Sequence, residues 1–242
     1  MRVAVVSDIH SNLAAFEAVT ADFVDVDEVW CLGDVVGYGP DPNECIDHLR
    51  SFDHCCIAGN HDWAAIGRIG TEDFNPDAQA AAEWTAQQLA PANWRFLEDL
   101  PTKLERNGFT LAHGSPRDPI WEYIIYSSAA EASLDHFTTA YCFVGHTHVP
   151  VIFSCAATAR TCATLDPSYE RPFPLGNQRL IINPGSVGQP RDGVADARYV
   201  VLDLDRRTFT HRRVAYDIEK TQRKMQQANL PARLWMRLSY GW

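Results

Sequence analysis

Aspartate, histidine and asparagine residues occur in five short motifs whose side chains could bind metal ions. Carboxylate, imidazole and amide-oxygen ligands suit hard and borderline divalent cations. Residues two apart in an extended or turning chain can point to the same side, as in the pairs Asp8 and His10, and His146 and His148. In chain order, the motifs are Asp8-Ile9-His10, Gly33-Asp34, Gly59-Asn60-His61-Asp62, Ala112-His113-Gly114 and Gly145-His146-Thr147-His148.

Each motif directly follows a short apolar run that the sequence predicts to be a β-strand. In sheets of the α/β class, ligands collect just beyond the carboxyl ends of the strands. We therefore expect the motifs to converge in space. Glycines before Asp34, Asn60 and His146 permit a positive φ or a close backbone approach at these turns. Seven candidate ligands are too many for one tetrahedral ion, whereas two ions that share a bridging carboxylate would use them all.

The order of these motifs resembles that of the calcineurin-like metallophosphoesterases, and the resemblance runs from Arg2 to about Ala215. It implies an α/β fold, a double β-sandwich flanked by helices in four α-β-β-α layers, with a dinuclear metal centre at the strand ends. We expect residues 1–242 to form a single domain of this kind. Three segments are also similar to the bacterial and archaeal phosphodiesterase-type branch: Ser7-Asp8-Ile9-His10-Ser11-Asn12, Gly33-Asp34-Val35-Val36-Gly37-Tyr38-Gly39-Pro40 and Asn183-Pro184-Gly185-Ser186-Val187-Gly188.

The resemblance, carried over residue by residue, implies two divalent transition-metal ions, with manganese the first choice and iron, zinc or nickel the alternatives. His61 is implied to face the leaving group as a general acid and not to be a ligand. Asp62 is implied to orient the His61 ring. The first ion would be held by Asp8, His10, Asp34 and His148, and the second by Asp34, Asn60, His113 and His146, with Asp34 as the bridge.

The implied activity is hydrolysis of a small phosphodiester or phosphomonoester by a metal-bridging hydroxide that attacks phosphorus. Tyr38 departs from the pattern of protein serine/threonine phosphatases and symmetric dinucleoside tetraphosphatases, which carry an arginine before the corresponding glycine. Loss of that phosphate clamp disfavours a protein phosphatase and makes dinucleotide cleavage a minor alternative. Arg117 and Arg191 are either its substitutes or ordinary surface arginines.

The charge composition and the set of motifs bear on the other functions that this chain could have. The 21 basic residues against 31 acidic ones give a net charge of −10, which disfavours a nuclease, broad nucleic-acid binding and docking on an anionic membrane. A non-catalytic metal-binding scaffold of the same fold is a further alternative. The presence of His61 together with all seven candidate ligands favours an enzyme whose partner is a small-molecule phosphate ester.

The first sixty residues alternate between predicted strands and helices. Strands are expected at 2–7, 28–32 and 55–58, and helices follow the first two of them. Ser11 or Asn12 is expected to cap a helix that buries Leu13, Phe16 and Val19. This alternation predicts a parallel, doubly wound arrangement.

The remainder of the chain begins with a helical excursion from the sheet at about 64–100, with Asn75 capping its first helix. Ser128 and Glu131 are expected to form a capping box for a helix that runs to Phe137. Residues 155–178 are the least regular. Further strands are expected at 109–112, 141–144, 149–153, 180–182, 199–203 and 208–215, the last two as a hairpin, before a helix at 218–229.

The seven cysteines have no repeated spacing and no CxxC pair, so we expect reduced thiols and no disulfide framework or thiolate zinc site. No signal-like segment and no apolar run of about 20 residues is present, which favours a soluble, cytoplasmic protein. Six aromatic residues could line a substrate site, although core packing is favoured for them. These are Trp63, Trp84, Trp94, Trp121, Tyr123 and Tyr126.

Overall fold

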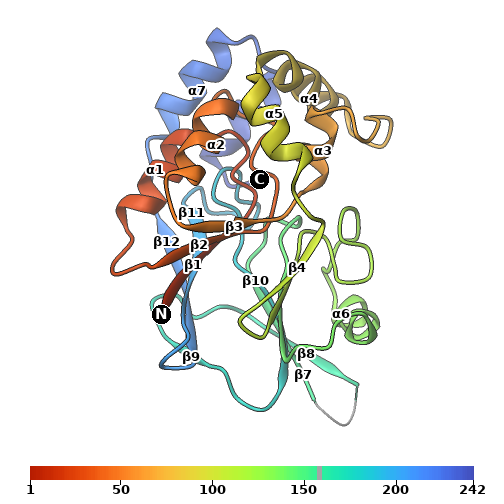
Figure 1. Cartoon of the computed structure of the whole chain (residues 1–242). Helices are drawn as coiled ribbons and strands as arrows, with labels where there is room; N and C mark the ends of the chain where they lie inside the picture. The colour runs from red at the N-terminus through yellow and green to blue at the C-terminus, as the bar shows by residue number, and fades with distance from the viewer. Residues whose placement is uncertain (157–159) are drawn as a thin grey trace.

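The computed structural model describes residues 1–156 and 160–242 and places two β-sheets face to face between outer layers of helices (Figure 1). This arrangement confirms the double sandwich flanked by helices that the resemblance implies. The expected irregular segment 155–178 lies partly outside the described residues, and its described part includes two short strands, β8 and β9.

The first sheet has the strand order β3-β2-β1-β11-β12-β9. Its strands β1, β2 and β3 are parallel, and β11 runs antiparallel to β1, with Arg2 opposite Asp203. The expected hairpin is confirmed, since β11 and β12 pair from Asp203 and Thr208 outward. The strands are β1 (Arg2–Val6), β2 (Glu28–Cys31), β3 (His54–Cys56), β9 (Phe173–Pro174), β11 (Ala197–Asp203) and β12 (Thr208–Val214).

The second sheet has the order β4-β5-β6-β10-β7-β8. Its central strands β5, β6 and β10 are parallel to one another, and the strands outside them are antiparallel to their neighbours. The strands are β4 (Lys103–Arg106), β5 (Phe109–Ala112), β6 (Tyr141–Phe143), β7 (Val151–Cys155), β8 (Cys162–Leu165) and β10 (Arg179–Asn183).

Alternation along β1 explains how the first sheet becomes an inner layer. Val3 and Val5 face the second sheet, where they pack with Phe143 and other buried side chains. Ala4 and Val6 face the opposite way and join the helix-side core with Phe16. Both faces of the strand are therefore apolar, as for buried parallel strands in general.

Helices α1 (Leu13–Ala21) and α2 (Pro42–Arg50) both contribute to this helix-side core (Figure 1). The expectation of a doubly wound first half is therefore wrong: its helices cover one face of the sheet, and the second sheet covers the other. The alternation of strands and helices is the same in both architectures, and the sequence pattern alone does not separate them.

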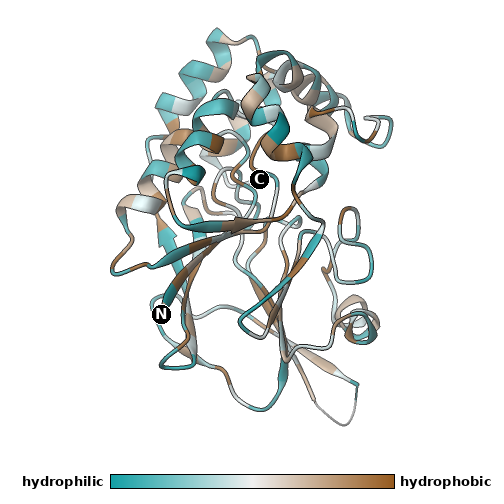
Figure 2. Cartoon of the chain, viewed as in Figure 1, coloured by the Kyte–Doolittle hydropathy of each residue, from teal (hydrophilic) through white to brown (hydrophobic). Residues whose placement is uncertain are grey.

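The helical excursion expected at about 64–100 contains α4 (Pro76–Gln88) and α5 (Pro91–Glu98), and the short helix α3 (Asn60–Ala65) precedes it. As predicted, the Asn75 side chain caps α4 by accepting a hydrogen bond from the Ala78 amide. The C-terminal helices α7 (Ile218–Gln227) and α8 (Ala232–Met236), with the 3₁₀ turn Arg237–Ser239, bury Leu234 and Leu238 against Tyr38 and α4. Figure 2 shows α7 mainly hydrophilic, as expected for an outer helix.

Helix α6 (Ser127–Ser133) covers the outer face of the second sheet and is followed by a 3₁₀ turn at Leu134–His136. The predicted capping box is wrong, because the N-cap residue is Tyr126, two residues before Ser128, and Glu131 instead accepts a hydrogen bond from the Cys162 amide. A hydrogen bond between α6 and β8 thus replaces the predicted hydrogen bond within the first turn of the helix. Among the described residues, no helix is both long and apolar enough to cross a bilayer.

Cys155 and Cys162 form a disulfide between β7 and β8, where they are directly opposite each other. This pair contradicts the expectation that all seven thiols are reduced. A separation of seven residues gives no recognisable disulfide pattern, and only the strand pairing brings the two together. The other five cysteines are free.

Candidate metal centre

The five motifs meet at one end of the sandwich, at the carboxyl ends of parallel strands from both sheets. Asp8 and His10 follow β1, Asp34 follows β2, and Asn60 begins α3 after β3. From the second sheet, His113 follows β5, and the pair His146 and His148 follows β6. The predicted convergence is therefore present in the structure, and these side chains are buried.

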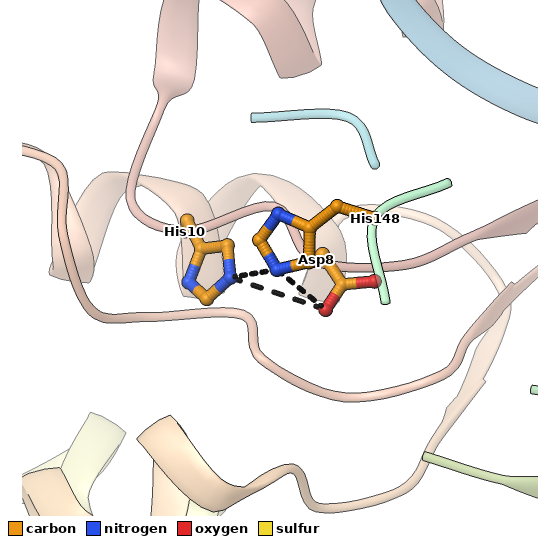
Figure 3. Close-up of side chains that lie close together, drawn as sticks. All are labelled: Asp8, His10 and His148. Atoms are coloured by element: carbon orange, nitrogen blue, oxygen red, sulfur yellow. Dashed lines mark hydrogen bonds and ion pairs between the residues drawn. The ribbon is translucent and has the colours of Figure 1, made fainter. Parts of the chain in front are cut away.

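One group consists of Asp8, His10 and His148 (Figure 3). Oδ1 of Asp8 lies 3.3 Å from Nε2 of His148 and 3.9 Å from Nε2 of His10. The two Nε2 atoms are 3.0 Å apart. Oδ1 of Asp8 is buried and has no hydrogen-bond partner among the described residues. Three potential ligand atoms thus point at one small volume.

A second group consists of Asp34, His113 and His146. Nε2 of His113 lies 3.3 Å from Oδ2 of Asp34 and 3.1 Å from Nδ1 of His146. The amide oxygen of Asn60 is 3.3 Å from the same His113 nitrogen, so Asn60 also reaches this group.

Asp34 lies between the two groups. Its Oδ2 atom is 3.7 Å from Nε2 of His10 in the first group and 3.3 Å from Nε2 of His113 in the second. Its Oδ1 atom accepts a hydrogen bond from the His61 amide, which fixes the carboxylate. Oδ2 has no hydrogen-bond partner among the described residues, which is the arrangement that a bridging carboxylate needs.

The hydrogen bonds of the imidazoles show which nitrogens are available as ligands. The Nδ1 atoms of His10, His113 and His148 lie 3.1, 2.8 and 2.6 Å from the main-chain carbonyls of Val36, Leu32 and Gln189. A carbonyl only accepts, so each Nδ1 carries the proton and donates it. When the rings are neutral, each Nε2 therefore presents a lone pair to the centre.

Two lone pairs that face each other at 3.0 Å, as in His10 and His148, repel unless a cation lies close to both. Burial also lowers the pKa of both His10 and His148 well below the usual value, so both rings are neutral at pH 7. The donor set of carboxylates, imidazoles and one amide therefore fits divalent transition-metal ions.

The charges of these side chains also favour the binding of metal ions. Burial raises the pKa of Asp8 to about 7, although the nearby His113 opposes this change. Burial opposes protonation of His113, but the Asp34 and Asp8 carboxylates outweigh it and raise the His113 pKa to about 10. The nearby imidazoles lower the pKa of Asp34 despite its burial, whereas Asp8 lacks sufficient positive charge, which metal ions would supply.

Left-handed backbone conformations recur in this centre. The loops that carry the ligands make turns tight enough to require positive φ even at residues other than glycine. Such conformations cost free energy and concentrate at functional sites. The residues are Asp8 (φ 54°), His10 (49°), Asp34 (53°), His146 (63°) and His148 (59°).

Glycines make two of these turns possible in different ways. Gly33, before Asp34, has φ 92°, a conformation that glycine adopts readily. Gly59, before Asn60, has an ordinary φ, but a Cβ atom there would lie 2.1 Å from Oδ1 of Asp34. A close approach to the candidate bridging carboxylate therefore requires glycine at position 59.

His61 lies beside the centre in an aromatic environment. Its ring centroid is 4.3 Å from that of Tyr38, 4.7 Å from Phe74 and 4.9 Å from His10. Its Nδ1 atom is buried and has no hydrogen-bond partner in the described part of the chain. Burial lowers the pKa of His61 to about 4, against the attraction of the Asp34 carboxylate.

The expectation that Asp62 orients the His61 ring is wrong. Oδ2 of Asp62 accepts hydrogen bonds from the Asp34 and Gly59 amides, at 2.7 and 3.0 Å, and Oδ1 accepts one from Val36 at 3.1 Å. Asp62 therefore ties the Asp34 loop to the start of α3. Consecutive side chains on a helix point about 100° apart, which explains why Asp62 and His61 serve different neighbours.

The structure distinguishes Arg117 from Arg191, for which the sequence allowed either contact with a phosphate or an ordinary surface position. Arg117 is paired with Glu122 at the surface, on the loop before α6. Arg191 instead lies at the centre: its amide donates to the His148 carbonyl at 3.3 Å, and its Nη2 is 3.4 Å from the Tyr38 hydroxyl. Arg191 is thus the better placed of the two for contact with a substrate.

Aromatic residues divide in a similar way. Trp63 and Trp84 pack against the core clusters, as favoured from the sequence. Tyr123 is 47% exposed, and its ring stacks on His146 at a centroid distance of 3.9 Å. Tyr38 and Phe74, which pack on His61, were not identified as site aromatics from the sequence, because no spacing links them to it.

A model of the calcineurin-like phosphoesterase superfamily domain matches residues 1–207. An uncharacterized protein of Methanocaldococcus jannaschii is 36% identical over 247 residues, covering 99% of this chain and 98% of its own length. A crystal structure of a metallophosphoesterase from Sphaerobacter thermophilus is 43% identical, with a TM-score of 0.92 and coverage of 100% of this chain and 99% of its own.

Shorter matches involve proteins named symmetrical bis(5′-nucleosyl)-tetraphosphatases. One from Pseudomonas putida is 32% identical over 77 residues, which is 26% of this chain and 27% of that protein. The chain therefore spans about a quarter of that relative's length.

Proposed function

Because the chain belongs to the calcineurin-like phosphoesterase superfamily, we propose that it is a metal-dependent hydrolase of a small phosphodiester or phosphomonoester. The observation that carries this proposal is the pair of neutral imidazoles, His10 and His148, whose Nε2 lone pairs face each other beside two buried carboxylates. We also propose that residues 1–242 form one domain, since β12, beyond the matched range, pairs along its whole length with β11.

In this proposal, Asp8, His10, Asp34 and His148 hold one divalent transition-metal ion, and Asp34, Asn60, His113 and His146 hold a second. Two such ions, when bound, supply Lewis-acid charge that polarises phosphoryl oxygens and favours ionisation of water. Manganese is the first candidate, and iron, zinc and nickel are the alternatives.

The reaction forms a bond from the oxygen of water to phosphorus and breaks the bond from phosphorus to the leaving oxygen. That oxygen must gain a proton, and we assign its transfer to His61. The negative charge of a bound ester adds to that of Asp34 and favours the protonated imidazole, against the burial that lowers the His61 pKa. Tyr38 and Phe74 hold the ring in place on two sides.

The experiment that tests this proposal measures hydrolysis of bis(p-nitrophenyl) phosphate and p-nitrophenyl phosphate by manganese-reconstituted protein. Asp34→Asn protein and a chelator-treated sample are measured in parallel. We expect diester cleavage that is lost in both controls, with metal content in Asp34→Asn reduced below two ions per chain. If the protein binds two metal ions per chain but hydrolyses neither ester with manganese, iron, zinc or nickel, the proposal is contradicted and a binding role is supported.

A further inference from the structure

The segment that carries Arg191 is bonded directly to a candidate metal ligand. The Arg191 amide donates to the main-chain carbonyl of His148 at 3.3 Å. Two residues earlier, the Gln189 carbonyl accepts a hydrogen bond from Nδ1 of the same histidine at 2.6 Å. The backbone of this segment is therefore fixed against the candidate centre, and Arg191 places a positive charge at its edge.

The Arg191 guanidinium makes no ion pair with a carboxylate of any described residue. The neighbouring Asp192 instead accepts two hydrogen bonds from the fully buried Arg198, at 3.0 and 2.8 Å. The partners of the Arg191 Nη2 atom are neutral: Oε1 of Gln189 at 3.0 Å and the Tyr38 hydroxyl at 3.4 Å. Because the adjacent carboxylate is bound elsewhere, the charge of Arg191 stays available to an anion at the centre.

The Tyr38 hydroxyl adds a neutral donor to this cation. Its oxygen accepts the hydrogen bond from Arg191, and a tyrosine hydroxyl keeps its own proton at neutral pH. That hydrogen has no acceptor within residues 1–156 and 160–242. The Tyr38 ring lies 4.6 Å from the ring of His10 and 4.3 Å from that of His61, measured between centroids. The hydroxyl thus belongs to a residue that contacts both a candidate ligand and the candidate acid.

The candidate ligands themselves offer no donors to an anionic substrate. They present carboxylate oxygens and imidazole lone pairs to the centre. Donors for a phosphate oxygen that the metal ions do not contact must therefore come from side chains outside the ligand set. Arg191 and Tyr38 supply two such donors, and hydrogen bonds from an arginine to a phosphate oxygen are strengthened by charge.

We propose that Arg191 and the Tyr38 hydroxyl together bind an unesterified oxygen of the substrate phosphate, and that this pair makes the site select phosphomonoesters over phosphodiesters. A monoester has one more unesterified oxygen and one more negative charge than a diester, so it attracts a cation more strongly. In a diester, an organic group occupies the position of that oxygen and leaves Arg191 without an anion. The inference rests on the proposed function, which includes both classes of ester.

The kinetic test compares kcat/KM for p-nitrophenyl phosphate and bis(p-nitrophenyl) phosphate, which share a leaving group. Arg191→Gln should lower the ratio of monoester to diester about ten-fold or more, the loss of a charge-assisted hydrogen bond. Tyr38→Phe, which keeps the ring, should lower it about three-fold. Arg191→Lys, which keeps the charge, should retain most of the preference.

The matched control is Arg223→Gln, since Arg223 pairs with Glu219 on the exposed face of α7, and its ratio should be unchanged. Metal content should be the same in all these variants, because none of them alters a candidate ligand.

A binding measurement separates this inference from the proposed function. Calorimetric titration of the metal-loaded protein uses inorganic phosphate, a dianion at slightly alkaline pH, and dimethyl phosphate, a monoanion. Arg191→Gln should weaken the binding of inorganic phosphate about ten-fold more than that of dimethyl phosphate. If phosphate binding depends on Arg191 in this way but neither aryl ester is hydrolysed, the oxygen-binding pair stands and the proposed function fails. If both esters are hydrolysed with a ratio that is the same in the unaltered protein, Arg191→Gln and Tyr38→Phe, the pair is overturned and the proposed function stands.

Discussion

At the scale of single residues, the candidate ligand histidines differ from His61, the candidate general acid, in what their ring nitrogens contact. The candidate ligand histidines have one nitrogen committed to a carbonyl or to the centre, whereas the His61 side chain is held by ring contacts alone in the described structure. Its side chain is therefore expected to be dispensable for metal binding. The main-chain amide of His61, which donates to Asp34, would remain in His61→Ala.

His61→Ala should lower turnover of an aryl diester by about 10²–10⁴-fold, the usual contribution of a general acid. Metal content should stay near two ions per chain, measured by elemental analysis. His136→Ala, at an exposed position in the 3₁₀ turn after α6, is the control and should retain activity. Loss of metal together with activity would show that His61 is a ligand and that its assigned role is wrong.

At the scale of elements, two helix caps that look alike in the sequence differ in what else they hold. Asn75 caps α4 and is exposed. Asn12 caps α1 but is buried, and it also bonds to the Gly188 carbonyl, the Tyr216 hydroxyl and the Thr221 hydroxyl. Asn12 thus ties the loop after β1, which carries His10, to the loop after β10 and to α7.

Asn12→Ala should therefore cost more stability than Asn75→Ala. The loss of a cap alone costs about 1 kcal/mol, which is the expectation for Asn75→Ala. Asn12→Ala also leaves buried polar groups unpaired, which adds about 1–3 kcal/mol. Urea denaturation of both variants would measure the free energies of unfolding, and equal losses would show that the additional contacts of Asn12 contribute little.

At the scale of the whole molecule, the sandwich buries a histidine that no motif uses. His211 on β12 is 2% exposed, and its Nε2 lies 2.9 Å from the Asn183 carbonyl, to which it donates. Burial lowers the pKa of His211 to about 4, from 6.5 in an unstructured chain. The unfolded chain therefore takes up a proton between pH 6.5 and 4 that the folded protein does not, and stability is lost as pH falls through that window.

His211→Gln removes this titration. We expect the free energy of unfolding of the unaltered protein, relative to that of His211→Gln, to fall by about 2–3 kcal/mol between pH 7.5 and pH 4.5. The buried histidines of the centre add their own acid sensitivity, but they are common to both proteins and cancel in the difference. Denaturant unfolding at several pH values measures it; a difference that does not change with pH would contradict the assigned burial effect.

Local order along the chain was predictable from the sequence. The motifs follow the strands as expected, Asn12 and Asn75 cap their helices, and β11 and β12 form the expected hairpin. Each of these features depends on residues a few positions apart, whose spacing, capping chemistry and apolar pattern are visible in the sequence. The strands β4 and β8 and the short helices α3 and α8 were not predicted, since such short segments show little periodicity.

Tertiary structure alone decided which faces and distant side chains meet. Helices could have covered both faces of the first sheet, but the second sheet occupies one of them, and it brings His113, His146 and His148 to Asp8 and Asp34. Three further features also depend on contacts between distant segments. They are the Cys155–Cys162 disulfide, the hydrogen bonds from the Asp34 loop to Asp62, and the approach of Arg191 and Arg237 to Tyr38. The sequence by itself determined the candidate ligands and the order of the elements that carry them, because those depend on local chemistry. The surroundings of the ligands depend on burial between segments far apart in the chain, which no local spacing encodes.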